Sequence, residues 1–217
     1  MDELSRREFR ILPWNLIKAT LAFFDRVSVV FVNLHINPNT LTCLGFVAGA
    51  GVGLAFALEE PVWALAGVLL CGVLDILDGR VAVQANRRSL FGAILDSSFD
   101  RYTEFFMYTG LAYRFRSHWV IWVIFSAFLG STMVSYTRAR AEGLGISCRN
   151  VGIMQRDERL VLLFAGTFLG LVFDVFDTAM MAVMIVIAMV SNFTAFQRIA
   201  YVRSWEKKRN AEEGNGD

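Results

Sequence analysis

The stretch DILDGRVAVQANRRSLFGAILDSSFD, residues 75–100, decides how this chain folds. Its four carboxylates are Asp75, Asp78, Asp96 and Asp100. The first two are three residues apart and the last two are four apart. On a helix, either spacing places both side chains on one face. The short polar connection at 84–89 predicts two helices that fold back on each other. The four acids are therefore expected to converge on one cleft.

Such a cluster is costly because the surrounding sequence is apolar enough to lie in a membrane. Each aspartate deep in a membrane helix costs roughly 2.5–3.5 kcal/mol, and neighbouring carboxylates repel one another. A divalent cation removes both penalties, and all-oxygen ligands favour Mg²⁺ or Mn²⁺ over Zn²⁺. We therefore predict that the four aspartates hold two Mg²⁺ or Mn²⁺ ions. Gly79 and Gly92 place bare backbone on the same face, where a phosphate can approach closely.

The composition is that of one membrane domain. The chain has 217 residues, is 55% hydrophobic and carries a net charge of +1. Several apolar runs reach the roughly 20 residues that a membrane-spanning helix needs. We predict an all-α integral membrane protein, a single domain over 1–217, with no nucleic-acid partner. It would comprise a juxtamembrane helix at 13–32, a six-helix core at 39–204 and a charged tail at 205–217.

Six spanning helices are predicted at 41–58, 62–83, 90–113, 119–141, 160–173 and 179–199. The segment at 13–32 contains Lys18, Asp25 and Arg26, which favour an amphipathic helix lying in the membrane interface. The alternative is a poorly apolar first spanning helix. In the first predicted span, Gly45, Gly49 and Gly53 recur every four residues and predict close helix packing.

The distribution of basic residues predicts the orientation. Six spans place both termini on one side. Basic residues gather at the N-terminus, at 87–88, at 138–159 and after 198, whereas only Arg114 and Arg116 fall in the opposite loops. By the positive-inside rule, both termini and the acidic cleft face the cytoplasm. We therefore expect a multi-pass protein of the inner (cytoplasmic) membrane.

The acidic stretch resembles a known signature. The pattern D-x-x-D-G-x-x-A, nine further residues and G-x-x-x-D-x-x-x-D is similar to that of the CDP-alcohol phosphotransferase family. These integral membrane enzymes make phospholipid head groups, and they tend to form homodimers. One position departs from the signature: Val83 stands where the family has an arginine expected to contact the CDP pyrophosphate. Arg80, Arg87 or Arg88 could replace that charge.

The resemblance implies a reaction and a role for each residue. A phosphatidyl group would pass from a CDP-linked lipid to the hydroxyl of an alcohol, releasing CMP. Asp75, Asp78 and Asp96 would bind metal, and Asp100 would bind metal and act as general base. The residues implied to bind CDP are Asn39, Thr42, Asp75, Gly79, Ala82 and Ser89. Asn39 and Thr42 belong to a P-N-x-x-T entry common in the family, and helix capping is the simpler reading of both.

A second group of residues predicts the acceptor. The segments SYTRARAEG and GIMQRDERL, with QR at 197–198, resemble the phosphatidylinositol-phosphate synthase branch of the family. The resemblance implies that the acceptor's phosphate is bound by Ser135, Arg138, Arg159 and Arg198. Forked arginine donors suit a phosphate. The branch usually has lysine where Arg138 stands. The alternative is that these arginines only anchor the protein to lipid head groups.

We therefore predict an enzyme that transfers phosphatidyl from CDP-diacylglycerol, or a similar CDP-lipid, to a polyol phosphate, with inositol phosphate favoured. Three alternatives stay open. The acceptor could be glycerol phosphate or another alcohol. Val83 could mark a weakly active member that binds nucleotide. Intramembrane acids also occur in transporters and proton relays, but those acids are spread across the membrane depth.

Overall fold

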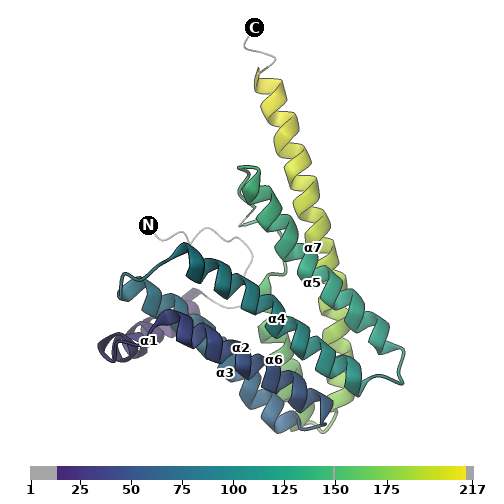
Figure 1. Cartoon of the computed structure of the whole chain (residues 1–217). Coiled ribbons are helices and arrows are strands. Elements are labelled where there is room, and N and C mark those ends of the chain that lie inside the picture. The colour runs from purple at the N-terminus through teal and green to yellow at the C-terminus, as the bar shows by residue number, and fades with distance from the viewer. Residues whose placement is uncertain (1–13, 149, 214–217) are drawn as a thin grey trace.

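The computed structural model describes residues 14–148 and 150–213, which form seven helices and no strand (Figure 1). The predicted all-α class is therefore confirmed for the described part. The helices are α1 (Trp14–Asn33), α2 (Pro38–Ala57), α3 (Pro61–Gln84), α4 (Leu90–Arg114), α5 (Val120–Gly143), α6 (Arg156–Val172) and α7 (Phe176–Glu213). The ends of the predicted domain, 1–13 and 214–217, lie outside the described residues.

The helix boundaries follow from local sequence. The Asn37 side chain accepts a hydrogen bond from the Asn39 amide and caps α2, whose first residue is Pro38. Pro61 likewise begins α3. Ser89 caps α4 by accepting from the Gly92 amide at 2.9 Å. These caps place the two acidic motifs at the adjoining ends of α3 and α4.

α5 is followed by Gly145 in the left-handed conformation, and four other helices stop at left-handed residues that are not glycine. They are His35, Glu59, Asn86 and Asp174, with φ between 53° and 62°. Each is followed by an amide that bonds back to the last helical turn, such as Arg87 N to Ala82 O. The tight turn at Asn86 makes α4 reverse direction directly after α3, as the polar connection predicted.

Helices α2 and α4 pack closely against each other. A Cβ built on Gly49 would lie 2.4 Å from the Thr103 side chain, and one on Gly53 would lie 2.3 Å from the Phe106 carbonyl oxygen. From the other side, a Cβ on Gly110 would lie 1.9 Å from the Gly53 carbonyl oxygen. The two backbones therefore touch, and the small-residue face predicted on α2 is confirmed at Gly49 and Gly53.

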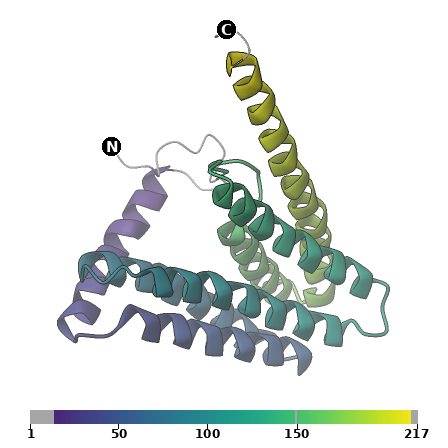
Figure 2. The same cartoon turned by 45° about the horizontal axis from the view of Figure 1, so that its top comes forward.

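The helices form two groups (Figures 1 and 2). In the first group α2 packs on both α3 and α4, and α1 leans against α3. In the second group α5 packs along α7. The two groups are joined by α6, which contacts both α3 and α7, and by α4 against α5. The first turn of α6 thus faces the acidic ends of α3 and α4.

Four helices in the described part are long and apolar enough to cross a membrane: α2, α3, α5 and α7. The predicted spans at 90–113 and 160–173 are helices too, but α4 carries four charges within Asp96–Glu104 and α6 has only 17 residues. Large apolar side chains such as Trp63, Trp122 and Phe196 are exposed. Such a surface indicates a membrane protein.

The N-terminal helix is tied to the end of α3 by polar contacts. Arg80 donates to Asp25 at 2.7 Å, and the Gln84 amide donates to the Asp25 backbone oxygen at 3.0 Å. The predicted helix at 13–32 is thus present as α1, and one of its charges serves to dock it. Both side chains of the ion pair are partly exposed, so its contribution to stability is small.

Candidate metal and phosphate-binding site

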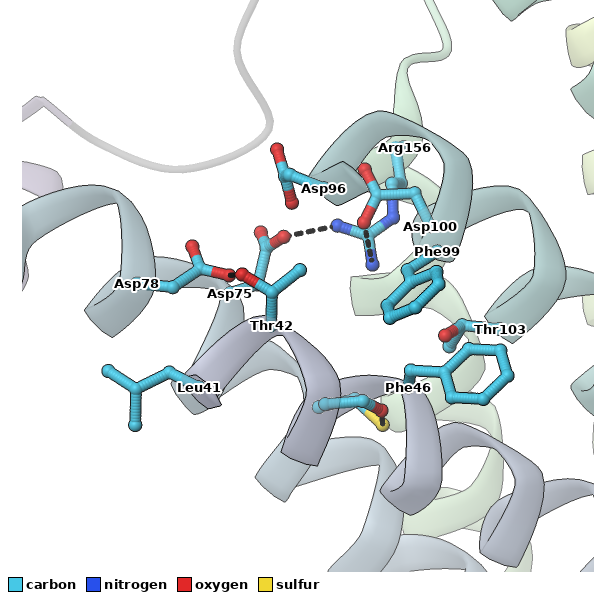
Figure 3. A pocket seen from close by; sticks show the side chains of 12 residues that line it. Leu41, Thr42, Phe46, Asp75, Asp78, Asp96, Phe99, Asp100, Thr103 and Arg156 are labelled. Carbon is cyan, nitrogen blue, oxygen red and sulfur yellow. Dashed lines mark hydrogen bonds and ion pairs between the residues drawn. The ribbon is translucent and has the colours of Figure 1, made fainter. Parts of the chain in front are cut away.

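Three of the four predicted acids meet at one point. Asp75 from α3 and Asp96 and Asp100 from α4 each offer a carboxylate oxygen, and these oxygens all lie within 4.8 Å of one another. They line a narrow cleft that is partly open to solvent (Figure 3). The aromatic rings of Phe46 and Phe99, stacked at 4.4 Å, form its apolar wall.

The fourth acid, Asp78, lies in the same cleft but is held by α2. Its Oδ2 accepts a hydrogen bond from the Thr42 hydroxyl at 2.7 Å, and the residue is only 7% exposed. Figure 3 shows this contact as a dashed line from the Thr42 hydroxyl to the Asp78 carboxylate. Thr42 was predicted to bind CDP, and the structure gives it a partner among the acids as well.

One residue of the cluster was not singled out from the sequence. Arg156, at the start of α6, donates through Nη1 to Asp75 and through Nη2 to Asp100 at 2.8 Å. Figure 3 shows its guanidinium between the two carboxylates. The sequence pattern favoured Arg159 from the same run. Arg156 and Arg159 share one helix face, and only the docking of α6 decides which of them reaches the acids.

The donors fit a divalent cation of the Mg²⁺ or Mn²⁺ class. Three carboxylates converge from α3 and α4, which both pack on α2, and all donor atoms are oxygens. Asp75, Asp96 and Asp100 would hold the ion directly. Asp78, whose orientation the Thr42 hydroxyl fixes, would complete the set. The number of ions and the choice of metal remain predictions.

Of the residues predicted to bind CDP, Thr42 and Asp75 line the cleft, whereas Asn39, Gly79, Ala82 and Ser89 are not among its lining residues. A Cβ on Gly79 would meet nothing within 4 Å, so the backbone there is open to a ligand. A Cβ on Gly92 would lie 3.0 Å from both Asn39 Oδ1 and Ser89 Oγ. Asn39 and Ser89, far apart in sequence, are therefore neighbours. Ala82 is partly exposed on the last turns of α3.

Val83 leaves an apolar, 47% exposed side chain where the family signature has arginine. Arg80 does not replace that charge in the cleft, because it is paired with Asp25 of α1. Arg87 and Arg88 are exposed in the turn between α3 and α4. The guanidinium that lies among the acids in this structure belongs to Arg156.

The predicted acceptor residues lie on α5, α6 and α7. Ser135 and Arg138 are partly exposed on one face of α5, and Arg138 is paired with Glu142 at 2.9 Å. Arg198 of α7 is 2% exposed and donates to the backbone oxygens of Val151 and Val134. Arg138 and Arg159 are both close enough to Arg198 for their charges to repel it. The structure thus brings three predicted arginines near one another.

Arg159 is more deeply placed than the sequence suggested. It is 1% exposed, and its Nε and Nη2 both lie 2.7 Å from Glu104 Oε1 on α4. Its Nη1 is buried without a hydrogen-bond partner in the described part of the chain. Glu104 continues the acidic stripe of α4 one turn beyond Asp100, a spacing that could have pointed to it. Any contact of Arg159 with an acceptor must compete with Glu104.

Replacing Thr42 by valine tests the Asp78 arrangement. Valine keeps the shape of the side chain and removes the hydroxyl that orients Asp78. Loss of such an outer partner typically weakens metal binding by roughly 10–100-fold, and we expect Mn²⁺ affinity to fall in that range. Titration of the purified protein in detergent measures it. The control is Thr40→Val on the same helix, because Thr40 is exposed; an equal loss in both variants would contradict the role of Thr42.

Comparison with known proteins places the chain in a family. The model of the CDP-alcohol phosphatidyltransferase family matches residues 35–204, and the chain belongs to this family. The matched region contains all the helices from α2 to α6 and most of α7. The resemblance seen in the acidic signature is therefore confirmed, and the protein is a transferase of the phospholipid-synthase class.

Among curated relatives, the archaetidylinositol phosphate synthase of Pyrococcus horikoshii is 33% identical over 192 residues, which cover 88% of this chain and 93% of the relative. The phosphatidylinositol phosphate synthase of Streptomyces avermitilis is 31% identical and covers 93% of this chain and 91% of the relative. The chain therefore spans nearly the full length of both.

Among solved structures, the phosphatidylinositol phosphate synthase of Mycobacterium tuberculosis with CDP-DAG bound superimposes with a TM-score of 0.73. It is 24% identical, and the match covers 82% of this chain and 92% of that one. The same enzyme in complex with manganese and citrate gives a TM-score of 0.74 at 24% identity, over 82% of this chain and 87% of that one. At this identity the likeness establishes the fold.

Proposed function

We propose that this protein transfers the phosphatidyl group of a CDP-linked diacylglycerol, or a similar CDP-lipid, to the hydroxyl of inositol phosphate and releases CMP. One observation carries the proposal: a converging acidic cluster, able to hold divalent cations, borders a group of arginines that repel one another. Clustered arginines are stabilised by an anion, and a phosphorylated acceptor brings one. Relatives named for inositol phosphate products support the choice of acceptor.

The chemistry follows from the placement of the acids. The acceptor hydroxyl attacks the phosphorus that bears the lipid, the bond from that phosphorus to the CMP oxygen breaks, and CMP leaves. Asp100 takes the proton of the attacking hydroxyl. Divalent ions held by the aspartates, Mg²⁺ or Mn²⁺ and two in number, would polarise the phosphates and stabilise the leaving CMP. The pyrophosphate would lie against the open backbone at Gly79, with the polar side chains of Asn39 and Ser89, which meet beside Gly92, as further contacts.

We propose that the acceptor's phosphate binds near the arginines of α5, α6 and α7. We assign Ser135, Arg138 and Arg198 to it, with Arg159 behind them. Arg138 offers the most accessible guanidinium of the three arginines, since Arg159 and Arg198 are almost fully buried. Arg198 is acted on by the charges of Arg138 and Arg159, and an anion beside it would offset that repulsion.

Alanine at Arg138 tests this assignment. Losing one charge-assisted hydrogen bond costs about 1.5–3 kcal/mol, so we expect the KM for inositol phosphate to rise roughly 10–100-fold. The KM for CDP-lipid should stay within about threefold of wild type, because Arg138 lies on the acceptor side. Arg140→Ala is the control, since Arg140 is exposed two residues further along α5. A change confined to CDP-lipid would place Arg138 in the other pocket.

The orientation in the membrane is also a proposal. We propose six spans, with the charged stretch of α4 crossing because Glu104 is paired with Arg159 inside the bundle and Asp100 with Arg156. Both termini and the cleft would face the cytoplasm of a cell with an inner membrane. Single cysteines placed before α1 and between α4 and α5 should react with a membrane-impermeant label from opposite sides of the membrane. Reaction of both from the same side would contradict the topology.

A homodimer is proposed from the family resemblance. The exposed apolar side chains of α4 and α5, among them Phe105, Trp122 and Phe125, leave a surface that lipid or a second copy can cover. Light scattering of the purified protein, with the detergent contribution subtracted, distinguishes a monomer from a dimer. A mass of one chain at all accessible concentrations would count against the dimer.

A CMP-release assay tests the whole function. Purified protein with CDP-diacylglycerol and Mg²⁺ or Mn²⁺ should release CMP with inositol phosphate and remain near background with free inositol. Glycerol phosphate should be a poor substrate; a faster rate with it would favour the second candidate acceptor. Release with none of these acceptors, together with intact nucleotide binding, would support the weakly active alternative raised by Val83.

A further inference from the structure

Arg156 occupies the same carboxylates that a divalent cation would use. Its Nη1 bonds to Asp75 and its Nη2 to Asp100, and both aspartates belong to the converging trio with Asp96. The Arg156 side chain is only 19% exposed, so the pairing is shielded from solvent. In this structure the guanidinium is thus the counter-ion of the acidic cluster (Figure 3).

A guanidinium and a divalent cation compete for these oxygens. A cation bound to a carboxylate oxygen at about 2.1 Å leaves a guanidinium on the same oxygen only a few ångströms away. Two positive charges that close in a shielded cleft repel strongly. We therefore expect cation binding to weaken the contact of Arg156 with at least one of its two aspartates.

The surroundings of Arg156 show where the freed guanidinium can go. Arg159, one turn further along α6, stays fixed by Glu104 at 2.7 Å and keeps the helix start in place. Arg156 and Arg159 are close enough to repel, and Arg159 in turn lies near Arg198. An anion placed among these arginines would attract Arg156 toward the acceptor side of the cleft.

We propose that Arg156 couples the two ligands: the divalent cation displaces it from Asp75 and Asp100, and the displaced guanidinium then binds the anionic acceptor. This inference rests on the proposed function for the identity of the acceptor. Since linkage is reciprocal, cation and acceptor each strengthen the binding of the other. Removal of Arg156 should therefore uncouple the binding of the cation from that of the acceptor.

The first measurement is Mn²⁺ affinity without any acceptor, followed through the free Mn²⁺ signal in electron paramagnetic resonance. Arg156→Met removes the competitor, keeps much of the side-chain volume and adds no oxygen ligand. We expect Mn²⁺ to bind about tenfold more tightly than to wild type, within the usual 5–150-fold range of coupling between sites. Unchanged or weaker Mn²⁺ binding would overturn the proposal.

Arg101→Met is the matched control. Arg101 acts electrostatically on Asp96, yet within the described residues it makes no hydrogen bond or ion pair with the trio. Its loss removes the same charge nearby without vacating the carboxylates. We expect less than about a fivefold change in Mn²⁺ affinity, as for exposed charge pairs. If Mn²⁺ affinity rose equally in Arg156→Met and Arg101→Met, the rise would come from the loss of any nearby positive charge, and the proposal would be overturned.

Arg156→Lys serves if the methionine variant does not fold. An ammonium is a single point charge and cannot reproduce the fork that reaches Asp75 and Asp100 together. Mn²⁺ should therefore bind more tightly than to wild type, by a smaller factor than in Arg156→Met. If the lysine variant bound Mn²⁺ with wild-type affinity, the contact of Arg156 with both Asp75 and Asp100 would not oppose the cation, and the proposal would be overturned.

The second measurement repeats the Mn²⁺ titration with saturating inositol phosphate and, separately, with sulfate. In wild type either anion should tighten Mn²⁺ binding, and in the Arg156 variants this gain should vanish. A gain of equal size in wild type and variants overturns the coupling. If sulfate shows coupling that depends on Arg156 while inositol phosphate neither binds nor releases CMP, the coupling stands and the proposed acceptor is wrong.

Discussion

Asp100→Asn is expected to reduce turnover by roughly 10²–10⁴-fold, the usual contribution of a general base. The substitution keeps the size of the side chain and one oxygen that can still face the cation and Arg156. It removes the group that would take the proton of the acceptor hydroxyl. CDP-lipid should therefore still bind within about threefold of its wild-type affinity, because Asp75 and Asp96 remain to hold the cation.

The two quantities are measured separately, turnover as the rate of CMP release and binding as the dissociation constant of CDP-lipid. Asp177→Asn is the matched control, because Asp177 makes an ion pair with Arg114 at the far end of α4. Its turnover should match wild type. If Asp100→Asn weakened binding and turnover by the same factor, Asp100 would be a metal ligand only.

Gly53→Ala is expected to lower the stability of the fold strongly. Its Cβ would lie 2.3 Å from the Phe106 carbonyl oxygen and 2.7 Å from the Phe106 carbonyl carbon, both part of the α4 backbone. Backbone cannot rotate away as a side chain can, so α4 must move as a whole. Overpacking of this kind costs about 1–3 kcal/mol, and we expect the upper end, a midpoint of thermal unfolding lowered by roughly 6–12 °C.

Gly51→Ala is the control on the same helix. A Cβ at Gly51 meets nothing within 4 Å, so the midpoint should stay unchanged or rise slightly, because alanine favours a helix over glycine. Thermal unfolding in detergent compares the two variants. The Gly53 variant should also bind Mn²⁺ more weakly, since a shifted α4 carries Asp96 and Asp100 away from Asp75. Equal midpoints for the two variants would contradict the close α2–α4 contact.

The acidic cluster could be predicted because its information is local. Spacings of three and four residues place carboxylates on one helix face, and the short connection at 84–89 turns the second helix back on the first. The sequence could not show that Asp78 is held by Thr42, 36 residues away, since that contact depends on the packing of α2 on α3. It likewise could not select Arg156, which lies 81 residues from Asp75.

Two of the six predicted spans, those in α4 and α6, do not have the length and hydropathy of a membrane-crossing helix. Each charged residue of α4 and α6 lowers their apolar character, although Glu104 and Arg159 neutralise one another inside the bundle. A sliding average along the sequence counts both as costs, because it cannot see that they are partners. The same limit applies at the other end of the chain. The charge after residue 204 predicted a separate tail, whereas α7 continues as a helix to Glu213.

The unbroken course of α7 has a practical consequence. A helix of 38 residues is roughly 57 Å long, nearly twice the about 30 Å of a bilayer's hydrocarbon layer. The helix is thus too long to lie wholly within the hydrocarbon layer along its normal, and its C-terminal turns project past the other helices (Figure 1). A fluorophore attached near Trp205 would lie on these C-terminal turns. Energy transfer from it to dyes in the membrane leaflet would report the tilt of α7 relative to the bilayer.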